Sequence, residues 1–208
     1  MSTLTLEQFQ VYLHDVPLTP ELNVSVAGGE TLTLMGPSGC GKSSLLLALA
    51  GHAHAPISRR GKVKINGQDV THLPAHQRKV GLLFQDDLLF PHLNVEQNLL
   101  FALPDDVART ERHSQVTQAL AKIEMSEFSR RFPNELSGGQ RARISLLRTL
   151  LSSPAVVALD EPFSKLDKTL RQHFRRWVFD ELKQANIAAL LVTHDEDDAP
   201  ENGQMICL

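Results

Sequence analysis

The sequence contains only two cysteines, Cys40 and Cys207, among its 208 residues. Two cysteines do not make a disulfide framework, so a reducing compartment is the simplest interpretation. The N-terminal segment MSTLTLEQF has neither a basic region nor an apolar core, which argues against a signal peptide. The longest apolar run, LLLALAG at residues 45–51, is far shorter than the roughly 20 residues that span a bilayer. Any role at a membrane would therefore depend on a partner.

An excess of positive charge is also lacking. The chain has 21 Lys and Arg against 24 Asp and Glu, a net charge of -3. This balance argues against the strongly basic surface of nucleic-acid-binding proteins, so we expect no nucleic-acid partner. Hydrophobic residues make up 42% of the chain, enough for a packed core. The length fits one domain, which we expect to cover residues 1–208.

Apolar strands alternate with amphipathic helices along most of the chain. After loosely alternating strands within residues 1–30, apolar strands are expected at residues 31–36, 80–84, 155–160 and 187–193. A hairpin is expected at residues 61–70, with its turn at Asn66 and Gly67. The pattern is helical from about 86 to 154 and again at 168–185. This order predicts an α/β fold with a mixed, mainly parallel core sheet, an N-terminal antiparallel β subdomain and an inserted α-helical subdomain.

The segment GPSGCGKS at residues 36–43 matches the phosphate-loop pattern G-x-x-x-x-G-K-[ST]. Its glycines let successive backbone N–H groups face one anion, and the following helix adds its positive end. A chance glycine turn is the alternative, but the position between an apolar strand and a helix favours nucleotide binding. The expected nucleotide contacts are Gly36, Pro37, Ser38, Gly39, Cys40, Gly41, Lys42 and Ser43. Lys42 supplies a charge for the phosphates, and the hydroxyl of Ser43 is suited to Mg²⁺.

Polar residues follow three other apolar strands. Asp160 and Glu161 end the strand VVALD, and ligands of open α/β sheets bind at that edge. Adjacent strand residues point in opposite directions, so Asp160 fits a metal ligand and Glu161 a base that orients water. His194 ends the strand LLVT and is a candidate for contact with the terminal phosphate or the water. Gln85 follows the strand VGLLF, either as an ordinary cap or as a residue that reaches the metal.

The segment LSGGQ, residues 136–140, opens a helix rich in arginine. Ser137 and Gln140 form a capping box, which does not require the helix-weakening Gly138 and Gly139. Glycines at a helix start allow close approach of a ligand, so a second anion site is expected there. The two expected anion sites lie about half the chain apart. One nucleotide could use both only if two chains faced each other.

The segment LSGGQ resembles the signature motif of the ATP-binding cassette (ABC) ATPases, and the whole chain is similar to the ATP-binding subunit of an ABC transporter. The segment GLLFQDDLLFPHLNVEQNLLF resembles the bacterial importer form. The segment LDEPFSKLDKTLRQHFRRWVF resembles short importer ATPases assigned to thiamine or related small solutes. The resemblance implies ATP and Mg²⁺ as ligands, and a dimer with two nucleotides sandwiched between the subunits.

The resemblance also implies a role for each motif. Residues 36–44, including Ser44 where the family usually has threonine, would bind phosphate. Lys42, Glu161 and His194 would be catalytic, and Ser43, Gln85 and Asp160 would lie at the metal. The signature that closes on the nucleotide of the opposite subunit would comprise Leu136, Ser137, Gly138, Gly139 and Gln140. Asp167 would lie in a loop that crosses the dimer interface. Tyr12 is placed near the adenine, although alignment puts Leu13 there.

The implied partners are transmembrane permease subunits and a solute-binding protein, with the chain in the cytoplasm on the inner face of the membrane. The segment DDLLFPHLNV would form the docking surface, or alternatively part of the helical core. A soluble ABC ATPase acting on DNA or ribosomes is the second hypothesis, although such proteins usually carry two cassettes or a long coiled coil. A small-molecule kinase is the third, but it would not need LSGGQ or SKLD.

Overall fold

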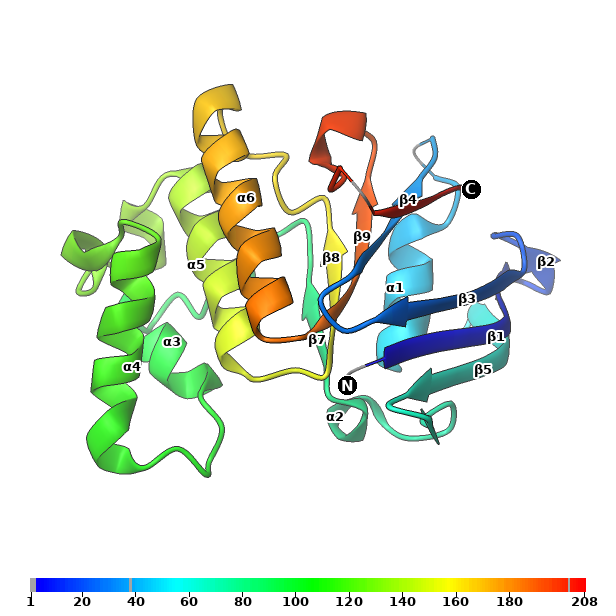
Figure 1. The fold of residues 1–208 in the computed structure, drawn as a ribbon, viewed down its shortest axis with the longest axis horizontal. Coiled ribbons are helices and arrows are strands. Elements are labelled where there is room, and N and C mark those ends of the chain that lie inside the picture. Colours follow the sequence, from blue (N-terminus) through cyan, green and yellow to red (C-terminus); the bar gives the residue numbers. More distant parts are fainter. Residues whose placement is uncertain (1–2, 38, 202) are drawn as a thin grey trace.

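The computed structural model describes residues 3–37, 39–201 and 203–208, which form two five-stranded sheets (Figure 1). The antiparallel sheet contains β1 (Thr3–Leu13), β2 (Val16–Pro17), β3 (Leu22–Ala27), β5 (Ile57–Ile65) and β6 (Gln68–Asp69). The other sheet is parallel and has the order β10-β4-β9-β8-β7. Its strands are β4 (Thr31–Met35), β7 (Val80–Leu83), β8 (Val156–Asp160), β9 (Ala188–Thr193) and β10 (Gln204–Cys207).

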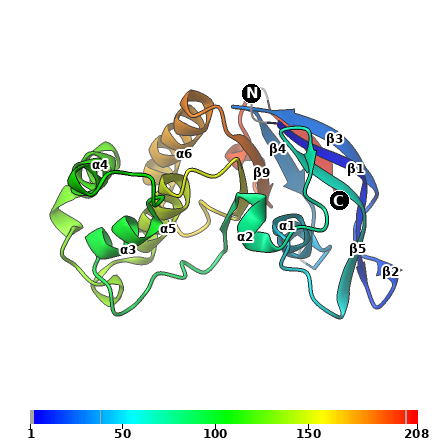
Figure 2. The same cartoon turned by 90° about the horizontal axis from the view of Figure 1, so that it is seen from below.

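The helices surround the parallel sheet on both sides. They are α1 (Lys42–Ala50), α2 (Ala75–Arg78), α3 (Val95–Ala102), α4 (Arg109–Lys122), α5 (Gly138–Leu151) and α6 (Lys168–Gln184). Short 3₁₀ segments occur at Ser126–Phe128, Pro133–Glu135 and Glu196–Asp198. In Figure 2, α1 lies beside the antiparallel sheet, whereas α3 to α6 lie on the other side of the molecule. In the part of the chain that the structure covers, no helix has the length and apolar character needed to cross a membrane.

The side chains of strand β8 pack into two different hydrophobic clusters, one on each face of the parallel sheet. All five of its residues are buried. Val156 and Ala158 pack into the cluster that contains α1 and the antiparallel sheet. Val157 and Leu159 pack into the cluster formed by α3, α4, α5 and α6. Alternation along a fully buried strand therefore places α1 and α5 on opposite faces of the parallel sheet.

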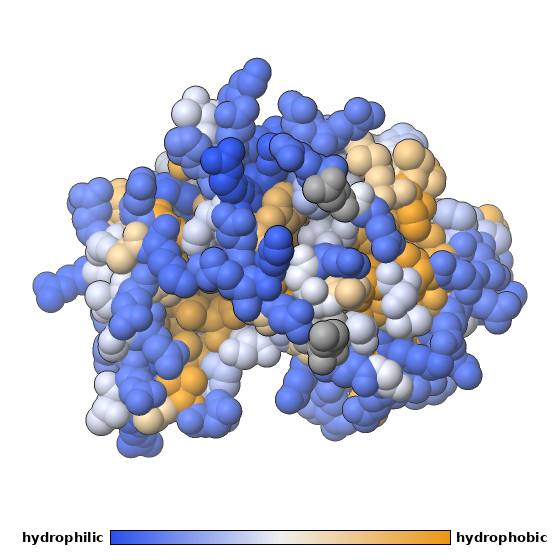
Figure 3. Space-filling model, viewed as in Figure 1, coloured by the Kyte–Doolittle hydropathy of each residue, from blue (hydrophilic) through white to orange (hydrophobic). Residues whose placement is uncertain are grey.

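The expected helices between residues 86 and 154 are present as α3, α4 and α5, which confirms the helical block of the predicted fold. The limits of this block as an inserted unit stay a prediction. A hollow of about 240 Å³ lies between α4, α5 and α6, where apolar side chains gather (Figure 3). Its walls include Ala119, Leu147, Leu150, Leu151 and Trp177.

The expected hairpin at Asn66 and Gly67 is confirmed. Both residues have positive φ, 54° and 77°, as the type I′ turn requires. The first strand of this hairpin, β5, begins at Ile57 rather than near residue 61, because β1 provides a long partner edge for it.

Arg78 joins the end of α1 to the segment that leads into β7. Its side chain is 3% exposed and donates to the carbonyls of Ala48 and Leu49 at the end of α1. It also donates to the carbonyls of Thr71 and Leu73. Burial lowers the pKa of this guanidinium, with a smaller contribution from the nearby Arg59. A single cation thus satisfies backbone acceptors that a helix end leaves unpaired.

Replacing Arg78 with methionine is expected to lower the free energy of unfolding by about 2–4 kcal/mol, because several buried carbonyls lose their donors at once. Urea denaturation followed by circular dichroism measures the change. Arg176→Met, at an exposed position of α6, is the matched control and should change stability by less than about 0.5 kcal/mol. Equal stabilities of the two variants would show that water replaces the guanidinium without cost.

Candidate functional site

The phosphate loop lies between β4 and α1, and its glycines have the backbone geometry that the sequence predicts. Gly39 and Gly41 have φ of 86° and 93°, in the left-handed region. A Cβ atom on Gly41 would lie 2.6 Å from Cγ of Leu18, so a side chain is excluded there on steric grounds as well. Gly41 is the N-cap of α1 and provides no side-chain cap. The first N–H groups of α1 are therefore open to an anion. Ser38 lies outside the described residues.

Lys42, the first residue of α1, has its ammonium group held inside the loop. Its Nζ donates to the carbonyls of Gly36 at 2.7 Å and Pro37 at 2.8 Å, and lies 3.8 Å from Sγ of Cys40. The residue is only 7% exposed. A positive charge is thus fixed at the point where the loop would receive phosphate. Ser43 and Ser44 follow on the first turn of α1.

Asp160, at the end of β8, lies beside this first turn. Its side chain is hydrogen-bonded to Ser43 and it is 8% exposed. Burial raises the pKa of the Asp160 carboxyl; the neighbouring Glu161 adds to the rise, while the bond to Ser43 and the charge of Lys42 oppose it. The predicted pair of oxygen groups, a hydroxyl and a carboxylate, is brought together here.

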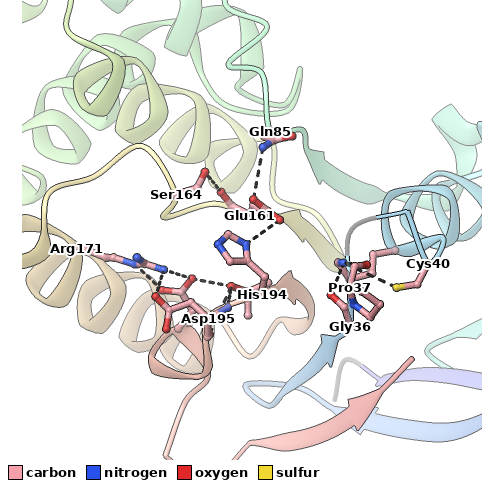
Figure 4. Close-up of polar contacts among 12 residues, drawn as sticks. Gly36, Pro37, Cys40, Gln85, Glu161, Ser164, Arg171, His194 and Asp195 are labelled. Carbon is pink, nitrogen blue, oxygen red and sulfur yellow. Dashed lines mark hydrogen bonds and ion pairs between the residues drawn. The ribbon is translucent and has the colours of Figure 1, made fainter.

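Glu161, the residue after Asp160, has a backbone φ of 46°, in the left-handed region. Figure 4 shows Glu161 between Gln85 and His194. The Nδ1 atom of His194 lies 3.0 Å from Oε1 of Glu161, and Nε2 of Gln85 lies 3.5 Å from its Oε2. The hydroxyl of Ser164 donates to the Glu161 carbonyl at 2.9 Å and closes the turn. Three residues predicted separately from strand ends thus form one cluster, although Gln85 faces Glu161 rather than the Ser43–Asp160 pair.

The segment LSGGQ begins α5, and its capping box is formed as the spacing predicts. The N–H of Gln140 donates to Oγ of Ser137 at 3.2 Å, and the N–H of Ser137 donates to Oε1 of Gln140 at 2.8 Å. A Cβ atom on Gly138 would meet only the end of a flexible arginine, 3.9 Å away. A Cβ atom on Gly139 would lie 3.1 Å from Cδ2 of Leu166. Gly138 is therefore approachable from outside, while Gly139 permits contact with the SKLD segment.

Asp167 ends the SKLD segment and caps α6. Its Oδ1 accepts from the N–H of Leu170 at 3.0 Å. The N-terminal ends of α5 and α6 lie along the same edge of the molecule as the tips of β8 and β9 (Figure 1). The signature and Asp167 are thus at the edge that carries the phosphate loop, but α1 and α5 lie on opposite faces of the sheet.

Asp87 makes contacts that were not predicted from the sequence. Its carboxylate lies 3.1 Å from Nε of Arg141 in α5 and 3.6 Å from Nζ of Lys165. Its carbonyl accepts from the Ser145 hydroxyl at 2.6 Å. The segment after Gln85 is therefore tied to the signature helix and to the SKLD segment. The acidic pair after Gln85 was the available sequence signal.

Tyr12, which the sequence places near the adenine, is buried in this structure, and its contact with the nucleotide stays a prediction. Its ring is 7% exposed and is covered by the guanidinium of Arg60, 4.6 Å from the ring centroid. Its hydroxyl donates to Gln10. The preceding residue, Val11, packs into the core on the α1 side, so Tyr12 points to the other face of the sheet. Leu13, which is 39% exposed, returns to the α1 side.

A glycine loop that leads into an uncapped helix start, with a buried lysine and two carboxylates at the end of the neighbouring strand, defines a P-loop nucleoside triphosphatase. The second glycine-opened helix narrows this class to the ATP-binding cassettes. The family described as ABC transporter matches residues 20–164. The chain therefore belongs to the ABC transporter family and is an ATP-binding ATPase subunit, which confirms the resemblance drawn from its motifs.

Similar proteins support this assignment over the whole chain. The uncharacterized ABC transporter ATP-binding protein YnjD of Escherichia coli K12 is 42% identical over 203 residues, covering 98% of this chain and 94% of that protein. The putrescine transport ATP-binding protein PotG of the same organism is 39% identical over 86% of this chain. An Fe(3+) ions import ATP-binding protein, FbpC 1 of Rhizobium meliloti, is 40% identical over 86% of this chain. These matches span 47% of PotG and 50% of FbpC 1.

A solved structure confirms the predicted fold. The ATP-binding cassette MJ0796, in a dimeric post-hydrolysis state bound to ADP and Pi, superimposes with a TM-score of 0.82. The superposition covers 99% of this chain and 94% of that one, at 25% identity.

Proposed function

We propose that this chain energises the import of a solute through a separate membrane subunit, by binding and hydrolysing ATP between two cassettes. The observation that carries the proposal is the placement of two glycine-built helix ends, on α1 and α5, on opposite faces of one sheet. A single chain can offer only one of them to a given nucleotide. Two chains arranged head to tail would enclose each nucleotide between the Lys42 loop of one and the Ser137 helix end of the other.

The residues have separate roles in this proposal. The N–H groups of the loop and the ammonium of Lys42 bind the phosphates, and the helix end at Ser137 closes on the terminal phosphate from the opposite subunit. Glu161 orients the attacking water and accepts its proton. His194, whose Nδ1 faces Glu161, fixes the direction of that carboxylate and presents its other nitrogen to the phosphate side. Asp167 lies at the contact between the two cassettes.

Mg²⁺ is the metal that we propose for the Ser43–Asp160 pair. The fit rests on donor chemistry: a hydroxyl and a carboxylate oxygen, adjacent and at the edge of the phosphate loop, are ligands of the kind that Mg²⁺ prefers. When bound, the ion would offset the negative charge of the phosphates. Gln85, which contacts Glu161 in this structure, is proposed as a further residue that would help to hold the ion.

Replacing Asp160 with asparagine should stabilise the nucleotide-free protein at neutral pH. Because the folded-state pKa is raised, the stabilising contribution of Asp160 is present below its unfolded pKa and is lost as pH rises through the folded pKa. We expect the melting temperature of the variant to exceed that of the wild type by roughly 1–4 °C at pH 7, and by less near pH 4.

Scanning fluorimetry at both pH values checks this prediction, with the exposed Asp180→Asn as the matched control. The same variant should lose the Mg²⁺-dependent part of its ATP affinity, measured by titration with and without the metal. A variant that is less stable than the wild type at pH 7 would show that the charge of Asp160 is well compensated in the fold.

Contact with the membrane subunit is proposed at an apolar surface near the segment DDLLFPHLNV. Leu88 is 56% exposed and Phe101, at the end of α3, is 68% exposed. Phe90 packs edge-on against Phe101 at 4.9 Å, and the buried Asn98 holds the loop through its carboxamide. Asp87 binds this loop to α5, the helix that begins at the signature. A displacement of the loop by the membrane subunit would therefore also displace the signature. In this proposal the chain lies on the cytoplasmic side of a membrane, bound through its partner.

Affinity purification from solubilised membranes tests the proposed function. We expect a membrane-spanning protein to be retained, and its presence to raise ATP turnover. The double variant Leu88→Asp, Phe101→Asp should lose this protein and keep its ATP affinity, whereas Val16→Asp, at an exposed site of the antiparallel sheet, should change neither. Retention of ribosomes or DNA instead would favour the soluble ABC ATPase. The thiamine or related small-solute class suggested by the sequence stays a prediction.

A further inference from the structure

Arg171, on the first turn of α6, makes a bidentate ion pair, and neither of its partners lies among the residues proposed to bind or hydrolyse ATP. Its Nε donates to Oδ1 of Asp198 at 2.7 Å, and its Nη2 donates to Oδ2 at 2.6 Å. The same Nη2 lies 2.9 Å from Oδ2 of Asp195. Asp198 is 1% exposed, so this fork is held in a water-poor setting where such pairs have fixed geometry.

The cluster contacts the residues on both sides of His194. The hydroxyl of Thr193 donates to Oδ2 of Asp198 at 2.8 Å, and the N–H of Asp195 donates to that hydroxyl at 3.1 Å. Thr193 and Asp195, the residues on either side of His194, are thus both held by one cluster. Figure 4 shows the contact between Arg171 and Asp195. The imidazole itself is largely exposed, and its Nδ1 contacts Glu161. Its position is therefore set through its backbone rather than by packing around the ring.

The other end of the cluster is the segment expected at the dimer interface. The N–H of Arg171 donates to the carbonyl of Asp167 at 2.8 Å, within the turn that Asp167 caps. Movement of Asp167 would therefore carry Arg171 with it. The Arg171 guanidinium binds Asp195 and Asp198 in the loop that contains His194. Such movement would therefore also shift the imidazole relative to Glu161.

We propose that Arg171 is a positioning residue that transmits the placement of Asp167 to His194 through Asp198 and Asp195. The cluster makes the alignment of His194 with Glu161 dependent on the state of the interface segment. The proposal rests on the function proposed above, in which Glu161 and His194 act at the terminal phosphate. An error of about 1 Å in such a group can lower a rate by about 10²-fold.

Arg171→Lys tests the proposal, because lysine keeps the charge and removes the planar fork. We expect kcat for ATP to fall tenfold or more, with KM and nucleotide affinity within about twofold of the wild type. The control is Arg112→Lys, since the guanidinium of Arg112 is likewise held by three hydrogen bonds, here to the carbonyls of Leu100, Leu103 and Pro104, but lies among the helices α3 and α4. Its kcat should be unchanged.

Imidazole NMR provides a readout that a purely structural role would not move. The His194 resonance is assigned by its loss in His194→Ala. In Arg171→Lys it should shift and broaden, while the other histidine resonances stay in place. A wild-type kcat, or a fall in kcat with an unmoved His194 resonance, would overturn the proposal.

The underlying function is tested separately with Glu161→Gln. If that variant hydrolyses ATP like the wild type, the assigned chemistry is wrong. If it does not, and Arg171→Lys behaves like the wild type, only the positioning role fails.

Discussion

Glu161→Gln is expected to lower ATP turnover by roughly 10³-fold and to leave ATP binding intact. General bases contribute about 10²–10⁴-fold to rates, and glutamine cannot accept the proton of the attacking water. The amide keeps the shape of the carboxylate and can still contact His194 and Gln85, which lie 3.0 and 3.5 Å from its oxygens in the native cluster. Phosphate release and nucleotide affinity, measured on the same preparation, separate chemistry from binding.

The same substitution should convert a transient dimer into a stable one. If ATP bridges the two cassettes, a chain that binds but does not cleave it stays closed. Light scattering with ATP should report twice the mass found without nucleotide. Glu111→Gln, at an exposed site of α4, is the control and should hydrolyse ATP normally. Normal turnover by Glu161→Gln would remove Glu161 from the role of base, and a monomer with ATP bound would contradict the sandwich.

Ser137→Arg is expected to abolish turnover while each separate chain still binds ATP. The large cation would occupy the space in front of the open Gly138, where the opposite subunit's nucleotide is proposed to lie. Loss of the cap should cost only about 1 kcal/mol in stability, which α5 can tolerate through its buried face. Turnover should therefore fall to the background rate, with nucleotide affinity within about twofold of the wild type.

A matched control exists in the same chain. Asn94 forms an equivalent capping box at the start of α3, with bonds of 2.8 and 3.0 Å to Gln97. Asn94→Arg removes a cap and adds the same charge away from the signature, so its basal ATPase rate should be near that of the wild type. Full activity in Ser137→Arg would refute the sandwich. Equal losses in both variants would point to helix stability instead.

The motifs that depend on local geometry were predictable. A left-handed φ at Gly39 and Gly41, and the reciprocal bonds of Ser137 and Gln140, follow from residue type and spacing within a few positions. The buried strand β8 followed from its continuous apolar run. These features fix the phosphate loop and the signature helix without reference to the rest of the chain.

The side chains that meet from distant segments were predicted only as candidates. Gln85 lies 76 residues and His194 33 residues from Glu161 in the sequence. Their meeting depends on the order of β7, β8 and β9 in the parallel sheet, which no local pattern specifies. The interactions of Asp87 and Arg171 were missed for the same reason.

By itself, the sequence determined a P-loop ATPase with a glycine-opened signature helix, because turn dihedrals and helix caps are set by neighbouring residues. Only the tertiary structure decided which face each distant side chain occupies. In β1, the pairing shifts between Leu6 and Phe9, with Gln8 at a φ of 50°, and the opposite Gly61 leaves room for the bulge. One extra residue reverses the alternation of a strand, so Val11 enters the core and Tyr12 points to the opposite face of the sheet, under Arg60.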